Sequence, residues 1–176
     1  MQHVRIGVVS GVISSTGDIL LQCRDQNVRH LAEWDKTQTG RLAIFRMLHG
    51  PVVDWCWRWF DARLPGAGSM RGVAMRVFAD QLLLMPPSMV GFFFSQGLLE
   101  GLSTAECTSR VRESFVPAAK ICLPFWCIVH TLTFSVFPPH LRMAWSQCAA
   151  VAWNALASEQ NQLARKREAA ARAQCE

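Results

Sequence analysis

The chain has 176 residues, of which 51% are hydrophobic and only 18% are charged. Soluble domains usually carry about 25% charged residues, so a membrane protein has to be considered beside a soluble one. The formal net charge of +5 comes without a basic stripe interleaved with aromatic side chains, which argues against direct nucleic-acid binding. Attraction to anionic lipid headgroups explains the same charge more simply.

The first segment, residues 6–17, is apolar and dotted with glycine. One arginine precedes it and no cleavage site follows, so we expect no removed signal peptide. After a polar connector, 24–39, residues 41–60 form an amphipathic helix with a tryptophan cluster typical of a membrane interface or of an aromatic core. Residues 61–72 are predicted to be a second connector.

Two windows, 81–99 and 121–141, contain no Asp, Glu, Lys or Arg, and each approaches the roughly 20 residues that span a bilayer. Residues 101–116 are predicted to connect them. The pair Pro138-Pro139 is expected to end one helix and start the next, 143–158.

The predicted fold is therefore all-α, a multispanning transmembrane helix bundle with about four spans, which begin near residues 6, 41, 81 and 121, plus an additional helix. A soluble all-α protein is the lesser alternative. We expect one membrane domain over 1–160 and a basic C-terminal tail over 161–176 that is partly helical or disordered.

Polar residues follow one face of the first helix. At 100° per residue they fall within an arc of about 80°: Gly7, Gly11, Ser14, Asp18 and Gln22. The spacing of the two glycines lets helix backbones approach closely. The carboxylate and the amide, four residues apart, can bond each other or a partner helix.

The third segment repeats this pattern. One arc of about 80° holds Asp80, Leu84, Ser88, Gly91 and Ser95, with Gln81 at its margin. Arg76 lies one turn before Asp80 and is expected to pair with it. The small residues Ser88, Gly91 and Ser95 are predicted to pack helices together.

Two uses of these polar residues stay open, because membrane-embedded polar groups serve both as contacts between helices and as the lining of aqueous paths. In the second use, Asp18, Gln22, Asp80 and Gln81 line a path, with Arg41, Arg76 and Arg142 as counter-charges. Alternatively, Arg142 pairs with Asp18 or Asp80 and closes the path.

No enzyme motif is present, and no cofactor is expected. The seven cysteines form no CxxC pair and lack zinc spacing, so neither a metal site nor a disulfide framework is predicted. His49, His130 and His140 are weaker candidates for polar sites.

An ordered set of motifs resembles one known family: Gly17-Asp18-x-x-x-Gln22, Arg41, Gly50-Pro51, Arg76-x-x-x-Asp80-Gln81-x-x-x-x-Pro86, Glu100-Gly101, Trp126, Phe134, Pro138, Arg142, and Trp153 with Ser158. The match runs from about residue 4 to 160, and its most specific stretch is DQLLLMPPSMVGFFFSQGLLEG. The chain resembles the Mpv17 and peroxisomal-membrane-protein (PMP22) family of small organelle membrane proteins.

The resemblance implies a multi-pass protein of the mitochondrial inner membrane or, as the alternative, of the peroxisomal membrane. It further implies a channel or pore for small solutes that contributes to metabolite and redox homeostasis. A non-conducting membrane scaffold or assembly factor is the competing interpretation. The expected partners are the lipid bilayer, small solutes or ions, and further copies of the chain in a homo-oligomer.

Overall fold

The computed structural model describes residues 2–25, 34–64, 66 and 68–153. These residues form helices and short connections, with no strand among them, which confirms the predicted all-α class. The predicted tail, 161–176, lies outside the described residues.

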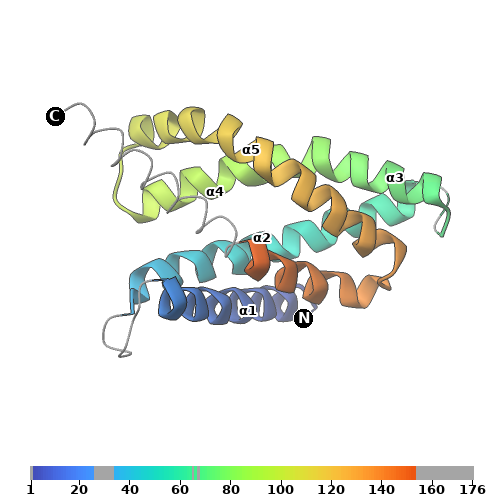
Figure 1. Ribbon diagram of the computed structural model, residues 1–176, viewed down its shortest axis with the longest axis horizontal. Coiled ribbons are helices and arrows are strands. Elements are labelled where there is room, and N and C mark those ends of the chain that lie inside the picture. The colour runs from blue at the N-terminus through green and yellow to red at the C-terminus, as the bar shows by residue number, and fades with distance from the viewer. Residues whose placement is uncertain (1, 26–33, 65, 67, 154–176) are drawn as a thin grey trace.

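Five labelled helices follow one another along the chain, and α3 and α4 run end to end in the same direction between the antiparallel neighbours α2 and α5 (Figure 1). Their bounds are α1 Gln2–Asp25, α2 Lys36–Arg63, α3 Met70–Ala79, α4 Met85–Leu99 and α5 Thr104–Ser135. A π-helical turn, Asp80–Leu84, joins α3 to α4 without a break, and a last helical segment covers 139–153. In Figure 1, α1 and α2 form the lower hairpin, α3, α4 and α5 lie above it, and the last segment returns toward the hairpin.

Side-chain caps set where three of the helices begin. The side chain of Asp35 accepts a hydrogen bond from the backbone of Gln38, and that of Ser69 accepts one from Gly72. Ser103 and Glu106 form a reciprocal capping box at the start of α5. Each cap satisfies backbone N–H groups that a helix start leaves free.

The helix that starts at Ser103 corrects one prediction. Residues 104–116, expected to be part of a connector, form the first turns of α5. The charges in this stretch lie on exposed helical turns, so charge density alone did not indicate a loop. The break expected at Pro138-Pro139 is confirmed, because α5 ends at Ser135 and the next helix starts at 139.

The π-helical turn lies directly before Pro86 and Pro87. A proline ring clashes with the carbonyl four residues earlier, and here those carbonyls belong to Leu82 and Leu83 in the wider turn. The π turn also inserts about one residue into the helical register. Side chains after the π turn therefore point in a different direction around the helix axis from the one that regular α-helical periodicity predicts.

Among the described residues, three helices are long and apolar enough to cross a membrane by length and composition: His3–Cys23, Met70–Leu99 and Thr104–Ser135. The span predicted to begin near residue 41, in α2, is not among them. The second of these helices contains the whole charge-free window 81–99, and the third contains residues 121–135 of the window 121–141. Large apolar side chains on the outside, such as Val12, Leu20 and Ile128, are 60% or more exposed. This outward apolar surface is typical of helices in lipid.

The interior combines an apolar cluster with many polar groups. The apolar cluster draws on α2, α3, α5 and the last segment through Val53, Trp57, Phe60, Val73, Phe134 and Met143. Buried polar side chains are about as numerous as the buried apolar ones. Because buried polar groups need partners, the functional site is sought among them.

Candidate functional site

The glycine face of α1 packs against two different neighbours. A Cβ atom added at Gly7 would lie 2.7 Å from the backbone oxygen of Met47, and one at Gly11 would lie 2.6 Å from that methionine's side chain. Gly17 instead faces Val151 in the last segment, where an added Cβ would lie 2.5 Å from a methyl carbon. Small residues therefore allow α1 to fit between α2 and the last segment.

Hydroxyl groups on α1 continue this contact. Ser14 donates a hydrogen bond to Oε1 of Gln147 at 3.3 Å, and Nε2 of Gln147 donates to Ser10 at 3.1 Å. All three side chains are buried. Ser14, which was predicted to pack helices, thus bonds the last segment through one hydrogen bond, and Ser10 bonds the same glutamine through a second.

Asp18 and Gln22 lie at the other end of α1, against the start of α2. The carboxylate of Asp18 accepts hydrogen bonds from Gln22 at 2.8 Å, Gln38 at 3.0 Å and Thr39 at 2.5 Å. Gln22 also accepts from the backbone N–H of Asp35 at 2.9 Å. Among the described residues the partners of Asp18 are neutral, and their arrangement joins two helices rather than lining a cavity.

The second predicted stripe is interrupted by the π turn. Asp80 and Gln81 are buried, but a Cβ atom added at Gly91 would meet nothing within 4 Å, and Ser95 bonds only its own helix at Phe92. The helix contact predicted at Gly91 and Ser95 is therefore not made there. Leu84 and Ser88 still line the cavity, and after the inserted residue the inward face also includes Met85, Met89, Phe92 and Gln96.

Asp80 is the centre of a buried cluster between α2, the π turn and α5. Its carboxylate accepts a hydrogen bond from Nε1 of Trp57 at 2.7 Å and lies 2.6 Å from Nδ1 of His130. Nε2 of Gln81 donates to it at 3.2 Å. Because a carboxylate only accepts hydrogen bonds, the proton of the His130 ring belongs on Nδ1. The rings of Trp57, Trp126 and Phe134 surround that imidazole.

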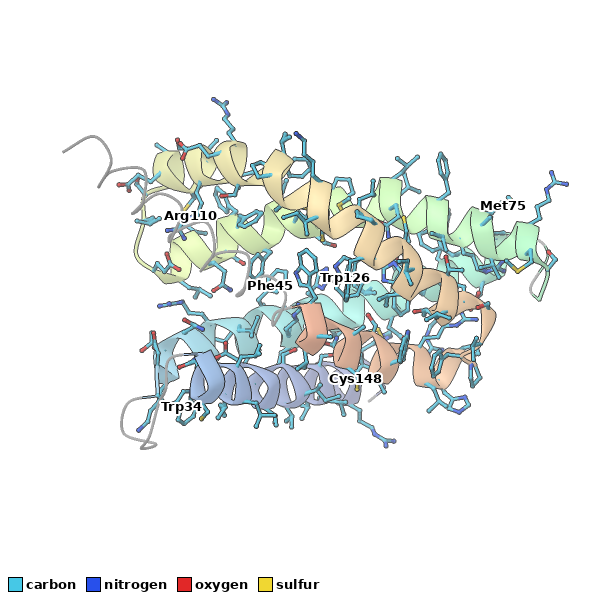
Figure 2. The ribbon with its side chains drawn as sticks, viewed as in Figure 1. Trp34, Phe45, Met75, Arg110, Trp126 and Cys148 are labelled. Carbon is cyan, nitrogen blue, oxygen red and sulfur yellow. The ribbon has the colours of Figure 1, made fainter. Side chains whose placement is uncertain are left out.

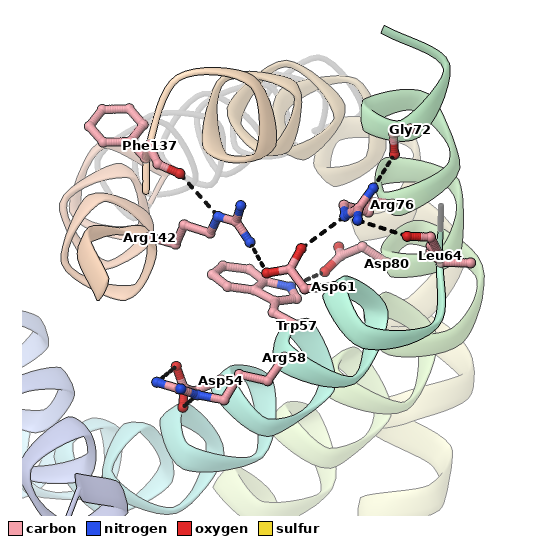
Figure 3. A network of polar contacts seen from close by, with 10 residues as sticks. All are labelled: Asp54, Trp57, Arg58, Asp61, Leu64, Gly72, Arg76, Asp80, Phe137 and Arg142. Carbon is pink, nitrogen blue, oxygen red and sulfur yellow. Dashed lines mark hydrogen bonds and ion pairs between the residues drawn. The ribbon is translucent and has the colours of Figure 1, made fainter. Parts of the chain in front are cut away.

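Asp61 joins the two buried arginines at the other side of Trp57. Figure 3 shows its carboxylate between Arg76, whose Nε lies 2.9 Å away, and Arg142, whose Nη1 lies 2.5 Å away. Arg76 also donates to the backbone oxygens of Leu64 and Gly72. The acid that pairs with Arg142 is therefore Asp61, rather than Asp18 or Asp80. Two of the three predicted counter-charges therefore pair with an acid that had been assigned to a connector.

Arg41 lies far along α2 from that cluster, near the turn between α4 and α5. Its guanidinium lies 3.9 Å from Glu100, which also pairs with Arg110 at 2.6 Å. The predicted set of polar residues is thus divided among separate sites: the Asp18 network, the Asp80 cluster, the Asp61 cluster and the Glu100 pair.

A cavity of about 190 Å³ lies between α2, the π turn, α4, α5 and the last segment. Figure 2 labels Phe45 and Trp126, which line it from the lower and upper layers. Its polar lining consists of Arg46, His49, Asp80, Gln81, Ser88, His130, Ser146 and Gln147. Asp80 and Gln81 are the only members of the predicted lining among these described residues. The cavity is the candidate functional site.

Within this cavity, His49 and Ser88 form a contact of 2.8 Å between the imidazole Nε2 and the hydroxyl oxygen. The described residues contain no group of three His, Cys, Asp or Glu side chains that could hold a metal ion. The chemistry that the cavity offers is therefore hydrogen bonding and charge, next to aromatic and methionine walls.

Comparisons with known proteins agree with this architecture. The model of the Mpv17/PMP22 family matches residues 97–158. Protein sym1 of Aspergillus oryzae is 29% identical over 152 residues, which cover 86% of each chain. The chain is therefore similar to the Mpv17/PMP22 family, through the family model over its C-terminal part and through relatives along most of its length.

Two further members of the Mpv17/PMP22 family carry names that state a location. The mitochondrial inner membrane protein Mpv17 of Rattus norvegicus is 26% identical over 155 residues, 86% of this chain and 85% of its own. Peroxisomal membrane protein 2 of Bos taurus is 25% identical over 154 residues, 83% of this chain and 76% of its own. No solved structure matches the chain at a significant level. This is a family of organelle membrane proteins.

The motifs that suggested the Mpv17/PMP22 family lie at contacts between elements. Gly50 faces Ser10 so closely that an added Cβ would lie 2.5 Å from the hydroxyl. Gly101 has φ of +85° in the turn before α5, a conformation that favours glycine. Glu100 beside it pairs with two arginines. These positions explain the motif residues as requirements of packing.

Sequence reasoning missed three residues of this region. Asp61 was assigned to a connector, Arg46 lay within the predicted amphipathic helix 41–60 without an assigned role, and His130 ranked as a weak candidate. A signal existed for His130, a lone polar ring inside a charge-free window, because such groups usually face the interior of a bundle. For Asp61 and Arg46 no local pattern separates an inward from an outward charge.

Proposed function

We propose that this protein is an integral organelle membrane channel that passes small solutes or ions and so contributes to metabolite and redox homeostasis. The observation that carries the proposal is the cavity of about 190 Å³, which has polar and charged groups on its wall inside a bundle with an apolar exterior. Intramembrane ionisable groups that face a cavity are typical of solute and ion paths.

The Asp80 cluster is the proposed polar centre of this path. Asp80 is 1% exposed and Gln81 is 6% exposed in the static structure, and both border the cavity. A carboxylate at this position favours cations nearby and disfavours anions. Removal of its charge should therefore change the ion preference of a conducting protein.

The test is a planar-bilayer recording of the purified full-length protein. We expect a conductance whose size and cation-to-anion permeability ratio shift in Asp80→Asn. Asp18→Asn is the matched control, because Asp18 is also buried and hydrogen-bonded but does not line the cavity. That control should conduct like the unchanged protein.

Silence from well-folded protein would contradict the channel. Equal shifts in the two variants would show that loss of a buried carboxylate disturbs the bundle without any special role for the cavity. Circular dichroism and a melting curve in detergent establish that each variant is folded.

A non-conducting scaffold or assembly factor is the second candidate. It is favoured by the saturation of the acids: Asp18, Asp61 and Asp80 each accept at least two hydrogen bonds or ion pairs from other elements. Detergent-extracted complexes on a native gel separate the two functions. A stoichiometric partner without conductance supports the scaffold.

For location, we propose the mitochondrial inner membrane, with the peroxisomal membrane as the alternative, since relatives named for each are similar to this chain. Fluorescence microscopy of the tagged protein against markers of both organelles decides between them. The proposed partners are the bilayer, small solutes or ions, and other copies of the chain, with no direct contact to nucleic acid and no enzymatic activity.

A further inference from the structure

Three buried side-chain atoms of the described residues have no hydrogen-bond partner: Nε of Arg41, Nε of Arg46 and Oε1 of Gln81. The last two belong to residues that line the same cavity. Native proteins leave few such atoms unpaired, because each one costs about 1–3 kcal/mol. The cavity therefore holds an unmatched donor and an unmatched acceptor.

The unmatched acceptor follows from the Asp80 cluster. The carboxylate of Asp80 needs donors, so Gln81 turns its amide nitrogen toward it at 3.2 Å. This orientation leaves the amide oxygen of Gln81 without a donor among the described residues. Water or an N–H or O–H group of a bound molecule can satisfy it.

The unmatched donor belongs to a cation. Other arginines of the described residues, among them Arg41, Arg58, Arg76, Arg110 and Arg142, form ion pairs. Arg46 forms no ion pair within the described part of the chain, and its guanidinium lies 6.0 Å from the centre of the Phe45 ring. A guanidinium in a partly enclosed cavity is costly unless an anion faces it.

The walls near Arg46 indicate what kind of anion fits. His49 and Ser88 add an imidazole and a hydroxyl on α2 and α4. Most of the remaining lining is aromatic or sulfur-containing, from Phe45, Met85, Met89, Phe92, Phe93 and Trp126. Methionine and aromatic walls suit an organic body, while a bare inorganic ion would lose its hydration against them.

We propose that the Arg46 end of the cavity is a binding site for a small organic anion, a carboxylate with a short apolar body. The guanidinium binds the carboxylate through charge-assisted hydrogen bonds, and the methionine and aromatic walls cover the body. This site rests on the proposed function in that the anion is one solute class admitted to the same cavity. Trp57, which bonds Asp80, lies about 16 Å along α2 from Arg46. At that end of the cavity the carboxylate of Asp80 favours cations instead of anions.

Direct binding tests the site without any need for conduction. The full-length protein in nanodiscs of zwitterionic lipid is titrated with sodium butyrate at constant ionic strength. Tryptophan fluorescence is the readout, because Trp57, Trp126 and Trp153 line the cavity. We expect saturable binding that weakens about 10- to 100-fold in Arg46→Gln, the range that corresponds to loss of a charge-assisted contact.

Arg58→Gln is the matched control, because Arg58 is on the same helix, does not line the cavity and pairs with Asp54. Its butyrate affinity should stay within twofold of the unchanged protein. Arg46→Lys keeps the charge but not the planar fork, so an intermediate loss is expected. Arg46→Gln should also melt no lower than the unchanged protein, since it removes an unpaired cation.

Inorganic phosphate is the second probe. Binding weaker than that of butyrate supports an organic anion, and binding as tight as butyrate would overturn that part of the assignment. Absence of saturable butyrate binding, or equal affinity in Arg46→Gln, would overturn the site altogether.

The same preparations in planar bilayers separate this inference from the channel. Butyrate binding without conductance leaves the site standing and removes the channel. Conductance without Arg46-dependent binding leaves the channel standing and removes the site.

Discussion

Asp18 and Asp80 look alike in the sequence and lie in regions of opposite character. Each begins the polar end of a small-residue stripe and has a glutamine nearby, and both are buried. Asp18 lies in a tight seam between α1 and α2, where neutral side chains from the start of α2 surround its carboxylate. Asp80 lies at the wall of a cavity, bonded by an indole and an imidazole.

The difference shows that the neighbours of a buried acid decide whether it joins two helices or lines a cavity. In the seam, Gly7 and Gly11 bring α1 close to α2, and further along α1 the side chains of Gln22, Gln38 and Thr39 bond the acid. Near the cavity, the change of register at the π turn leaves Gly91 and Ser95 without a helix contact, and methionine and phenylalanine line the cavity beside Ser88. The same sequence device therefore produces a closed contact in one region and an enclosed space in the other.

Replacement of Asp61 is expected to cause the largest loss of folding stability. In Asp61→Ala, Arg76 and Arg142, whose side chains are 3% and 11% exposed, lose the carboxylate that they share. We expect the free energy of unfolding in detergent to fall by about 3–5 kcal/mol. Denaturation followed by circular dichroism measures it.

Asp54→Ala serves as its control, since the partner Arg58 is 44% exposed. Loss of such a pair should cost about 1 kcal/mol or less. Similar losses in the two variants would mean that Asp61 is no more important to the bundle than a peripheral pair.

Asp18→Ala tests whether the seam is purely structural. Gln22, Gln38 and Thr39 lose their shared acceptor, so unfolding should become easier by about 2–3 kcal/mol. Conductance per folded protein should not change. A changed ion selectivity in this variant would break the comparison, because it would assign Asp18 to the path.

The smallest effect concerns glycines in the two regions. Gly7→Ala places a methyl group 2.7 Å from the backbone oxygen of Met47, so α1 and α2 must separate, at a cost of about 1–3 kcal/mol. Gly91→Ala meets nothing within 4 Å and should change stability by less than about 0.5 kcal/mol. Melting curves of the two variants side by side measure the contrast, and equal destabilisation would contradict it.

Much of the fold was predictable because the length of an apolar segment and the position of a proline that ends a helix are both local features of the sequence. Charge-free windows predicted helices around 81–99 and 121–141, and Pro138-Pro139 predicted the break after α5. The error at 104–116 arose because exposed charged residues are equally compatible with a helix and a connector. The capping box of Ser103 and Glu106 was a readable signal of the helix start there.

The candidate site was less predictable. Helical periodicity placed Asp80 and Gln81 on an inward face, and both line the cavity. It failed beyond them, at Gly91 and Ser95, because a wide turn changes the phase on which periodicity depends. The sequence also could not show which acid pairs with which arginine, because partners such as Asp61 and Arg142 are 81 residues apart in the chain.

The sequence by itself determined that the chain forms apolar helices with polar groups on inward faces, since helix period and residue polarity are properties of short segments. Its motifs also indicated the Mpv17/PMP22 family. Only the tertiary structure decided which acid meets which arginine, where the cavity lies, and that Arg46 faces it without an anion among the described residues. These features depend on the packing of helices distant in the chain, and a one-residue change of register is enough to redirect them.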